Sequence, residues 1–348
     1  LVFRPWGLLG KPLAFSRNIG SPEMPLRPGS AWFKGISLAI VLGLLAVPLL
    51  SHALPYTPVI LLDIFIAVLF AASLHFMMGP GGMPSFGHAA YFGLGAYGAA
   101  LLAKSAGWPM GPAIILAPIL AGAGAVVFGW FCVRLSGVYL AMLTLAFAQI
   151  VWSVVYQWDA FTGGSNGIIG VWPAPWLSGT AYYYFALAWV VLALFLLRRM
   201  IFSPFGYALR ASRDSALRAD ALGIDAKRVQ WIAFVIAGTF AGLAGALFVF
   251  SKGSTSPEVI SVGKSVDGLV MVLLGGLQVL VGPIAGAAAF TLLQDYFVGI
   301  TQYWRALFGV VILVIVLAFP QGIAGFVNLL VARFGRSREQ VAGTRGLP

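Results

Sequence analysis

The stretch that decides the fold is DIFIAVLFAASLHFMMGPGGMPSFGHAAYFGLGAYGAALL, residues 63–102. It contains two apolar runs, separated by GPGGMPSFGHAA at 79–90, which holds four glycines and two prolines. With their flanking residues the runs cover 58–78 and 86–104, and about 20 apolar residues are enough to cross a bilayer as a helix. Glycine and proline at this density are too many for a continuous helix. The stretch therefore predicts two membrane-spanning helices joined by a broken segment.

The composition of the whole chain favours the same class of protein. Of its 348 residues, 60% are hydrophobic and 9% are charged, and the mean hydropathy is +0.95. A soluble domain carries about 25% charged residues, so this chain has too little charge to cover a water-facing surface. A single cysteine, Cys132, excludes an intrachain disulfide, and the sequence has no Cys and His spacing typical of zinc. We therefore predict an all-α, polytopic integral membrane protein without a metal or cofactor.

Ten apolar runs predict ten membrane spans with both termini cytoplasmic. Basic residues accumulate in cytoplasmic loops, and this topology places seventeen of the 21 Lys and Arg residues on the cytoplasmic side. The net charge of +11 then reflects orientation and contact with anionic lipid, and nucleic acid is not expected as a partner. The predicted spans are 33–52, 58–78, 86–104, 111–131, 137–158, 181–200, 229–251, 266–281, 283–300 and 304–331.

This topology divides the chain into three parts. A basic cytoplasmic tail covers 1–32, the membrane domain covers 33–331, and a second cytoplasmic tail covers 332–348. The longest cytoplasmic loop of the membrane domain is 201–228.

Several motifs resemble chemical sites, but their context favours structural roles. GLGAYG at 93–98 satisfies a dinucleotide-binding pattern, yet it lies within an apolar helix and has no preceding strand, so close helix packing is favoured. The three histidines, His52, His75 and His88, have no metal-ligand spacing and are expected to be hydrogen-bonded structural residues. The carboxylates in the spans lie near helix ends, where water can solvate them, which counts against a proton-driven carrier.

The loop at 203–230 is the most informative segment outside the spans. Ser212 or Asp214 is expected to cap a short helix, and Gly223 is placed to end it. Leu217, Ala221 and Ile224 form one apolar stripe on this helix. Because a two-turn helix is not stable alone, it is expected to dock on a cytoplasmic partner; a solvated loop held by lipid is the alternative.

Polar and glycine-rich positions near or within the spans are candidates for the substrate pathway. Ser85 is expected to cap the helix that restarts after the break, and a helix N-terminus facing a cavity suits a substrate carboxylate. Tight packing of small residues is an equally compatible explanation of the break. TGGSNGI at 162–168 is either part of an outer gate or binding-protein seat, or an ordinary turn. The candidate pathway residues are Ser85, Gly87, His88, Tyr139, Thr144, Gly163, Gly164, Ser165 and Asn166.

Ordered motifs from about residue 60 to 330 resemble the M-type permease subunits of branched-chain amino-acid ABC importers. Besides 63–102, they include GVYLAMLTLAFAQI at 137–150, TGGSNGI at 162–168, the 203–245 region, LLGGLQVLVGPIAGAA at 273–288 and WRALFGVVILVIVLAFPQGIAG at 304–325. The resemblance implies a non-enzymatic transport subunit of a bacterial inner membrane. It implies two ABC ATPase subunits, a second permease subunit in a heterodimer and a periplasmic solute-binding protein as partners.

The same resemblance implies that residues 210–224 form the coupling helix that sits in a groove of an ATPase subunit. The family pattern E-A-A-x-x-x-G is matched loosely by ALRADALG at 216–223. The candidate coupling residues are Arg210, Arg213, Asp214, Leu217, Asp220, Ala221 and Gly223.

Two other classes of protein compete with this interpretation. A secondary carrier or channel would transport without an ATPase. A membrane-embedded enzyme has little support, because the sequence shows no His, Glu and Asp cluster and no activated nucleophile.

Overall fold

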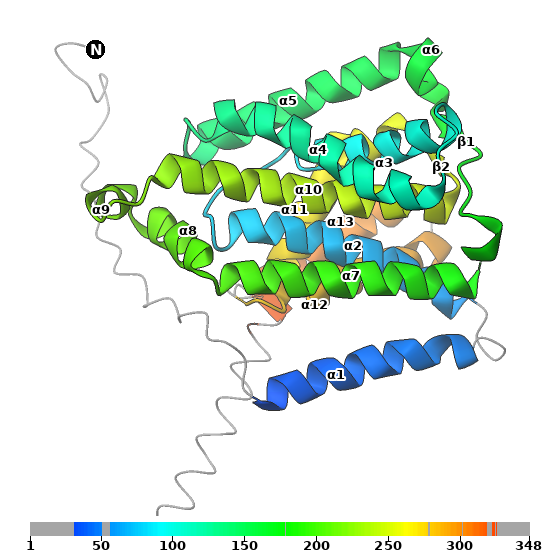
Figure 1. Cartoon of the computed structure of the whole chain (residues 1–348). Helices are drawn as coiled ribbons and strands as arrows, with labels where there is room; N and C mark the ends of the chain where they lie inside the picture. Colours follow the sequence, from blue (N-terminus) through cyan, green and yellow to red (C-terminus); the bar gives the residue numbers. More distant parts are fainter. Residues whose placement is uncertain are drawn as a thin grey trace, which may run out of the picture.

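The computed structural model describes residues 31–50, 56–177, 179–277, 279–300, 302–318, 322–323 and 325. The described part is a bundle of roughly aligned helices (Figure 1), and six of them are long and apolar enough to cross a membrane. These six are α2 (Thr57–Met78), α4 (Met110–Cys132), α5 (Gly137–Gln157), α7 (Thr180–Ile201), α10 (Ala226–Lys252) and α12 (Gly282–Ile300). The predicted helical membrane protein is therefore confirmed.

Four shorter helices complete the bundle: α1 (Ala31–Ala46), α3 (Ala89–Lys104), α11 (Val262–Gly275) and α13 (Trp304–Ala318). Each of the ten predicted spans overlaps one helix of the bundle, including the closely spaced pair at 266–281 and 283–300. The number of membrane crossings and the cytoplasmic termini stay predictions. Residues 1–30 and 326–348 lie outside the described residues, and so does His52; these ranges include most of the predicted tail at 1–32 and all of the one at 332–348.

Short elements mark the two ends of the bundle. α8 (Pro204–Asp214) and α9 (Ala216–Ala221) lie at one end, on the left of Figure 1. At the opposite end β1 (Ile168–Ile169) pairs with β2 (Ser254–Thr255) in an antiparallel ladder. We call these the α8–α9 end and the β1–β2 end. The remaining short helices are α6 (Asp159–Thr162), η1 (Val47–Leu50), η2 (Gly164–Asn166), η3 (Pro175–Leu177) and η4 (Pro257–Ile260).

The core of the bundle lies where α2, α3 and α10 pack together, around buried aromatic residues such as Phe70, Phe92 and Phe250. Small residues bring the helices close: a Cβ atom on Gly95 of α3 would meet the backbone of Gly242 in α10. The predicted packing role of GLGAYG is thereby confirmed.

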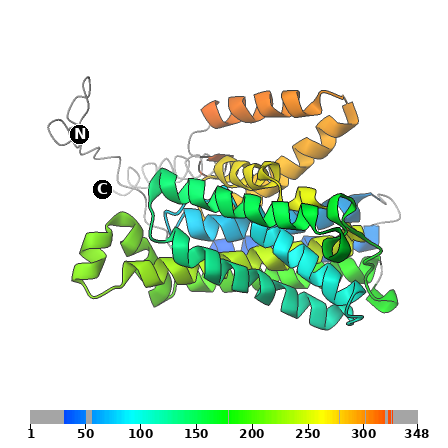
Figure 2. The ribbon, with the colours of Figure 1, turned by 90° about the horizontal axis from the view of Figure 1, so that it is seen from above.

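Gly286 plays the same part between α11 and α12, because a Cβ there would meet the Met271 carbonyl. The Gly282 and Gly286 pair therefore serves helix packing. α12 and α13 form a hairpin at one edge of the bundle, drawn in orange in Figure 2.

Two irregular segments run back into the bundle and give it an internal symmetry. After α2, residues 79–88 turn back beside that helix, and α3 begins level with Ser73, roughly 7.5 Å before the end of α2. After α10, residues 253–261 turn back in the same way before α11. The starts of α3 and α11 meet, because Ser265 Oγ accepts a hydrogen bond from Ala89 N at 3.1 Å.

The two halves run in opposite directions. α2 starts at the β1–β2 end, where Tyr56 contacts Asp295 of α12, whereas α10 starts at the α8–α9 end. The segments α2–α5 and α10–α13 therefore have the order of an inverted-topology repeat. Glycine content alone would pair the regions 79–98 and 275–286, but the counterpart of the break at 79–88 is 253–261.

Candidate functional site

The helix pair at the α8–α9 end is divided differently from the sequence prediction. The predicted helix at 210–224 is two helices, because Ser215 has an extended backbone (φ −166°, ψ 106°) that interrupts them. Ser215, not Ser212 or Asp214, caps α9, and its side chain accepts from Arg218 N at 3.3 Å. Ser212 instead donates to Leu209 O at 2.7 Å inside α8. Ser212, Asp214 and Ser215 all have side chains that can cap a helix. Only Ser215 has the extended backbone, just outside α9, that lets its side chain do so.

Gly223 ends α9 as predicted. Its φ of +82° is a left-handed conformation that glycine adopts without steric cost. Gly223 N donates to Asp220 O at 2.9 Å, and the Asp220 carboxylate accepts from Ala226 N at 3.3 Å. Asp220 therefore ties the end of α9 to the start of α10.

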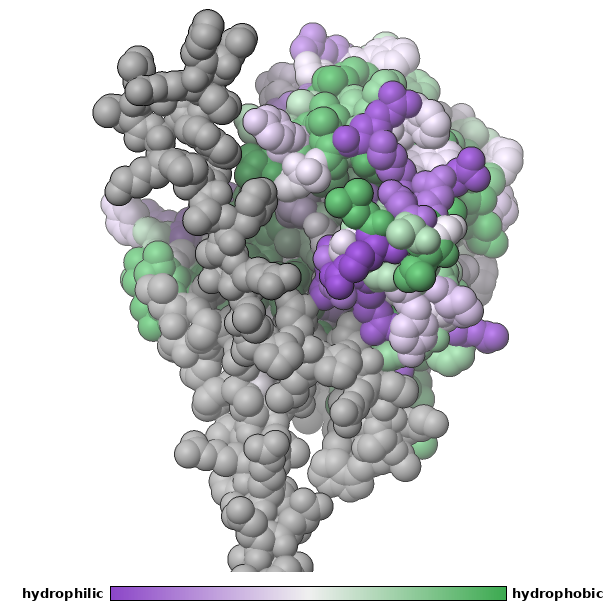
Figure 3. All heavy atoms as spheres, turned by 90° about the vertical axis from the view of Figure 1, so that its left-hand side faces the viewer, coloured by the Kyte–Doolittle hydropathy of each residue, from purple (hydrophilic) through white to green (hydrophobic). Residues whose placement is uncertain are grey.

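α9 presents apolar side chains to solvent. Leu217 is 85% exposed and Leu222 is 78% exposed, while Ala219 is buried against the rest of the chain. Figure 3 faces this end and shows hydrophilic side chains gathered there, with hydrophobic patches among them. Two exposed leucines beside Arg218 and Asp220 form a surface suited to a protein partner.

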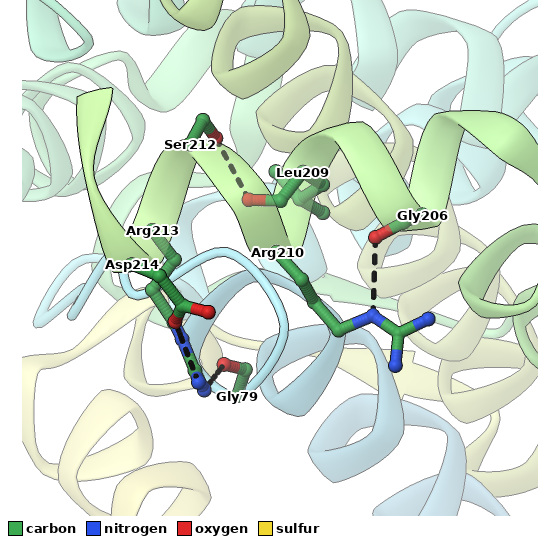
Figure 4. A network of polar contacts seen from close by, with 7 residues as sticks. All are labelled: Gly79, Gly206, Leu209, Arg210, Ser212, Arg213 and Asp214. Carbon is green, nitrogen blue, oxygen red and sulfur yellow. Dashed lines mark hydrogen bonds and ion pairs between the residues drawn. The ribbon is translucent and has the colours of Figure 1, made fainter. Parts of the chain in front are cut away.

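Arg213 connects α8 to the break after α2 (Figure 4). Its Nη1 donates to the Gly79 carbonyl at 2.9 Å, and the neighbouring Asp214 carboxylate holds the guanidinium at 3.0 Å. The Arg213 stem lies against Gly82, whose φ is +65° and where a Cβ would meet Arg213 Cγ. The glycine is therefore needed both for its backbone conformation and for the approach of the arginine.

Arg210 has a local role. Its Nε donates to Gly206 O at 3.3 Å and its Nη2 to Ile201 O at 3.2 Å, at the end of α7. The guanidinium also lies 4.4 Å from the centre of the Tyr207 ring. Arg210 thus fixes the corner between α7 and α8.

Four candidate pathway residues, Ser85, Gly87, His88 and Thr144, come together at the break between α2 and α3, and all are buried. Thr144 Oγ1 of α5 accepts from Phe86 N at 3.2 Å and donates to Ala141 O at 2.7 Å. Gly87 lies against the Thr144 carbonyl with no room for a Cβ. These contacts hold the broken segment against α5.

The prediction that Ser85 caps α3 is wrong. α3 begins at Ala89, and the hydroxyl bound to its first N–H is that of Ser265. Ser85 Oγ accepts only from Gly87 N, at 3.4 Å, among the contacts that the described residues record. A side chain 176 residues away in sequence has taken the capping role.

The structure bears out the structural interpretation of His75 and His88. His75 Nε2 lies 2.9 Å from Leu277 O, and His88 Nε2 lies 2.8 Å from Ser73 Oγ. The Ser73 hydroxyl donates to Phe70 O at 2.7 Å, so it accepts from His88 Nε2. The described residues contain no group of three or more His, Cys, Asp or Glu side chains that could hold a metal ion.

Tyr139 lies apart from these buried groups, on the exposed face of α5. Tyr139 is 74% exposed, and Gln149, Ser153 and Gln157 follow on the same face of the helix at i+10, i+14 and i+18. Gln157 Nε2 donates to Ser153 Oγ at 2.7 Å. Polar groups on the outer face of a membrane helix point to a protein or water neighbour instead of lipid. We call this face the α5 polar stripe.

The TGGSNGI segment forms an ordered turn at the β1–β2 end. Thr162 Oγ1 donates to Val155 O, at 2.6 Å, and lies 2.8 Å from Trp158 O. Gly163 and Gly164 have positive φ values of 76° and 53°. Ser165 and Asn166 are exposed on this turn, so it presents polar side chains outward from the bundle.

Charged residues that the sequence did not mark as a site meet near the same end. Lys252 Nζ lies 2.7 Å from Asp63 Oδ1, although 189 residues separate them. The Tyr56 hydroxyl donates to Asp295 Oδ1 at 3.1 Å, and this hydrogen bond raises the pKa of Tyr56 above its ordinary value. The only sequence signal for this cluster is the presence of charges close to predicted span ends.

The fold and these surfaces define a polytopic α-helical membrane protein with a short helix pair and exposed leucines at one end. Residues 56–318 match the family described as the branched-chain amino acid transport system permease component, and the chain belongs to this family. As a member of it, the chain is a transport permease and not an enzyme.

Individual relatives agree with this assignment. The chain is 28% identical to the high-affinity branched-chain amino acid transport system permease protein LivM of Escherichia coli (strain K12), over 74% of this chain and 67% of that protein. It is 27% identical to a probable LivM of Methanocaldococcus jannaschii, over 61% of this chain and 67% of that protein. It is also 32% identical to the autoinducer 2 import system permease protein LsrC of Photorhabdus laumondii, over 44% of each chain. No solved structure gave a significant match.

Proposed function

We propose that the chain is one of two permease subunits of an ATP-driven importer in a bacterial inner membrane, and that the importer takes up branched-chain amino acids or a related small amphipathic solute. The names of the relatives support the solute class. The proposed partners are two ABC ATPase subunits, a second permease subunit that forms a heterodimer with this chain, and a periplasmic solute-binding protein. The ten predicted spans support a cytoplasmic position for the α8–α9 end.

The observation that carries this proposal is the exposed apolar surface of α9, joined through α8 to the break after α2. Leu217 and Leu222 are the contacts offered to an ATPase groove. Asp214 orients Arg213, and Asp220, Ala221 and Gly223 set the shape and the end of the short helix. Movement of the ATPase subunits would shift α8 and α9 together and act through Arg213 on the Gly79 carbonyl.

The substrate pathway is proposed to run along the α5 polar stripe, between this chain and the second permease subunit. Tyr139 faces that pathway directly, while Ser85, Gly87, His88 and Thr144 position the broken segment behind it. Gly163, Gly164, Ser165 and Asn166 form the outer turn that faces the solute-binding protein. A pathway with polar hydroxyl and amide groups but little charge suits a solute with an apolar body.

Introduction of a charge on the apolar surface of α9 tests the proposal. Leu217→Glu and Leu222→Glu place a charge where an apolar contact is expected, and burial of one leucine contributes about 1.5–3 kcal/mol. Proline at Leu217 is a weaker test, because Leu217 is the second residue of α9, where proline is tolerated. We expect normal membrane insertion, loss of co-purifying ATPase subunits and loss of leucine uptake in proteoliposomes.

Leu135→Glu is the matched control, because Leu135 is an exposed leucine in the turn between α4 and α5. It is expected to leave ATPase association unchanged. Unchanged uptake in the two α9 variants, or uptake by the purified chain without ATPase subunits, would support the alternative of a secondary carrier or channel.

A further inference from the structure

A partly open cavity of about 280 Å³ lies near the β1–β2 end, between α2, α3, α10, α11 and α12. In the bundle (Figure 1), α2 packs against α10, α11 and α12, and α3 packs against α10. The cavity is separate from the α5 polar stripe, because no residue of α5 lines it. Its charged lining residues are Asp63, Lys252, Lys264 and Asp295, and its apolar floor includes Phe70, Phe92, Phe248 and Met271.

Two of the four charges form a close ion pair with each other, and two have no such partner among the described residues. Asp63 and Lys252 form an ion pair at 2.7 Å. For Lys264, the described residues record no ion pair within 4 Å: the Asp267 and Asp63 carboxylates act on it only from beyond that distance, and its ammonium lies 5.7 Å from the centre of the Phe92 ring. The Asp295 carboxylate accepts from the Tyr56 hydroxyl, and no described cation pairs with it within that distance. The cavity therefore offers one cation and one anion for a ligand.

The arrangement of these groups selects the charge pattern of the ligand. A partly buried ammonium is costly without an anion close to it. A carboxylate at Lys264 supplies that anion, and an ammonium at Asp295 satisfies the opposite charge. An anion alone leaves Asp295 unpaired, and a cation alone leaves Lys264 unpaired. The aromatic and thioether floor accommodates an apolar body between the two ends.

We propose that this cavity binds a small zwitterion with an apolar body, with its acid group at Lys264, its ammonium group at Asp295 and its apolar part on Phe70, Phe92 and Met271. The chemical class includes leucine and valine as free solutes and the headgroup region of phosphatidylethanolamine. The proposal rests on the proposed function only in taking leucine as the first probe.

The test uses the full chain assembled with its partner subunits in nanodiscs made of phosphatidylglycerol. Binding of radiolabelled leucine is measured without ATP and without the solute-binding protein, so that the binding protein's own site does not contribute. Lys264→Met is expected to weaken binding by roughly tenfold or more, the effect of losing one charge-assisted hydrogen bond. Asp295→Asn is expected to weaken it in the same way, and Lys264→Arg to retain binding.

Lys104→Met is the matched control, because Lys104 is an exposed cation at the same end whose ammonium donates to Ile169 O outside the cavity. It is expected to leave leucine binding unchanged. Co-purification of the ATPase subunits and thermal stability are measured for every variant, to separate loss of the site from loss of the fold.

A second arm identifies the source of the zwitterion. Native mass spectrometry compares the wild-type and Lys264→Met complexes, both taken from nanodiscs that contain phosphatidylethanolamine. Retention of this lipid by the wild type and not by Lys264→Met assigns the cavity to a lipid headgroup. Leucine binding, with equal lipid retention by the two complexes, assigns it to the free solute. Either result supports the zwitterion site.

Absence of both ligands, or binding unchanged by Lys264→Met and Asp295→Asn, would overturn the inference. ATPase association and uptake would then persist, and the proposed function would stand. Conversely, Lys264-dependent leucine binding by a chain that associates with no ATPase would support the site and reject the proposed function.

Discussion

The Arg213 guanidinium lies 2.9 Å from the Gly79 carbonyl, a contact between residues 134 positions apart. It joins the helix pair at the α8–α9 end to the point where α2 stops and the chain turns back toward α3. Arg213 is a residue of α8, and the neighbouring Asp214 also binds its guanidinium. The guanidinium is therefore expected to move with α8. The contact therefore connects the proposed ATPase surface directly to the broken segment.

Removal of this contact is expected to separate ATP hydrolysis from transport. Arg213→Met keeps much of the stem that lies against Gly82 but removes the charged donor. A hydrogen bond from a charged group contributes about 1.5–3 kcal/mol. We expect the ATPase subunits to stay bound while leucine uptake per ATP hydrolysed falls by roughly tenfold.

Arg228→Met is the control, because Arg228 is a mostly exposed arginine of the same end that pairs with Asp225 at 2.8 Å. It should leave the ratio of uptake to hydrolysis unchanged. A loss of ATPase binding in Arg213→Met, at normal protein levels, would instead assign Arg213 to the docking surface.

The cap of α9 gives a prediction that distinguishes Ser215 from its neighbour Ser212. Ser215→Ala removes the acceptor of Arg218 N and is expected to destabilise the six-residue helix by about 1 kcal/mol. Amide hydrogen exchange over 216–221 should become roughly fivefold faster. Ser212→Ala removes only a bond to a carbonyl within α8 and should leave exchange in α9 unchanged; an equal effect of the two variants would contradict the assignment of the cap.

The features that were predicted best from the sequence are those that depend on residues close together in the chain. Apolar runs became helices of the bundle, because length and hydropathy suffice to define a span. Gly223 ended its helix and Gly95 of GLGAYG packed against α10, since both roles follow from the absence of a side chain. The family resemblance held across most of the chain.

Contacts between segments far apart in the chain could not be predicted from the sequence. Ser265 caps α3 and Lys252 pairs with Asp63 over separations of 176 and 189 residues, and no local pattern encodes either pairing. The return of 253–261 into the bundle also has no signature of length or hydropathy. The cap of α9 was missed for another reason, because Ser212, Asp214 and Ser215 all carry suitable side chains within four residues and the backbone break decides among them.

Two glycines of the GLGAYG motif are expected to differ sharply in their tolerance of a methyl group. In Gly95→Ala the new Cβ meets the backbone of Gly242, which cannot move aside without separating α3 from α10. In Gly98→Ala the nearest atom is Leu120 Cδ1 at 3.2 Å, the flexible end of a side chain. We expect Gly95→Ala to lower the free energy of unfolding by about 1–3 kcal/mol and Gly98→Ala to have a smaller effect.

Thermal unfolding of the purified chain in one detergent checks this difference. Gly98→Ala is the matched control, because it lies in the same helix and the same motif. Similar losses in the two variants would show that helix propensity, and not the contact with α10, makes these glycines necessary.

The α5 polar stripe predicts where the second permease subunit lies. Gln149 is exposed on this stripe, near the middle of a span whose opposite face carries the buried Thr144. An exposed amide at that depth is costly against lipid, so a protein or water-filled neighbour is expected. Cysteine chemistry is well suited to test it, because the native Cys132 is the single cysteine and is buried.

Gln149→Cys is expected to form a crosslink with a cysteine introduced into the second permease subunit, and to lose uptake when the crosslink forms. Ile119→Cys on α4 is the control, because Ile119 is 56% exposed among apolar residues and is expected to face lipid. Crosslinking is measured by a shift in gel mobility, and uptake before and after reduction shows whether the loss is reversible. If Ile119→Cys crosslinks and Gln149→Cys does not, the contact between the subunits lies on α4. The polar groups of α5 would then face water and not the second permease subunit.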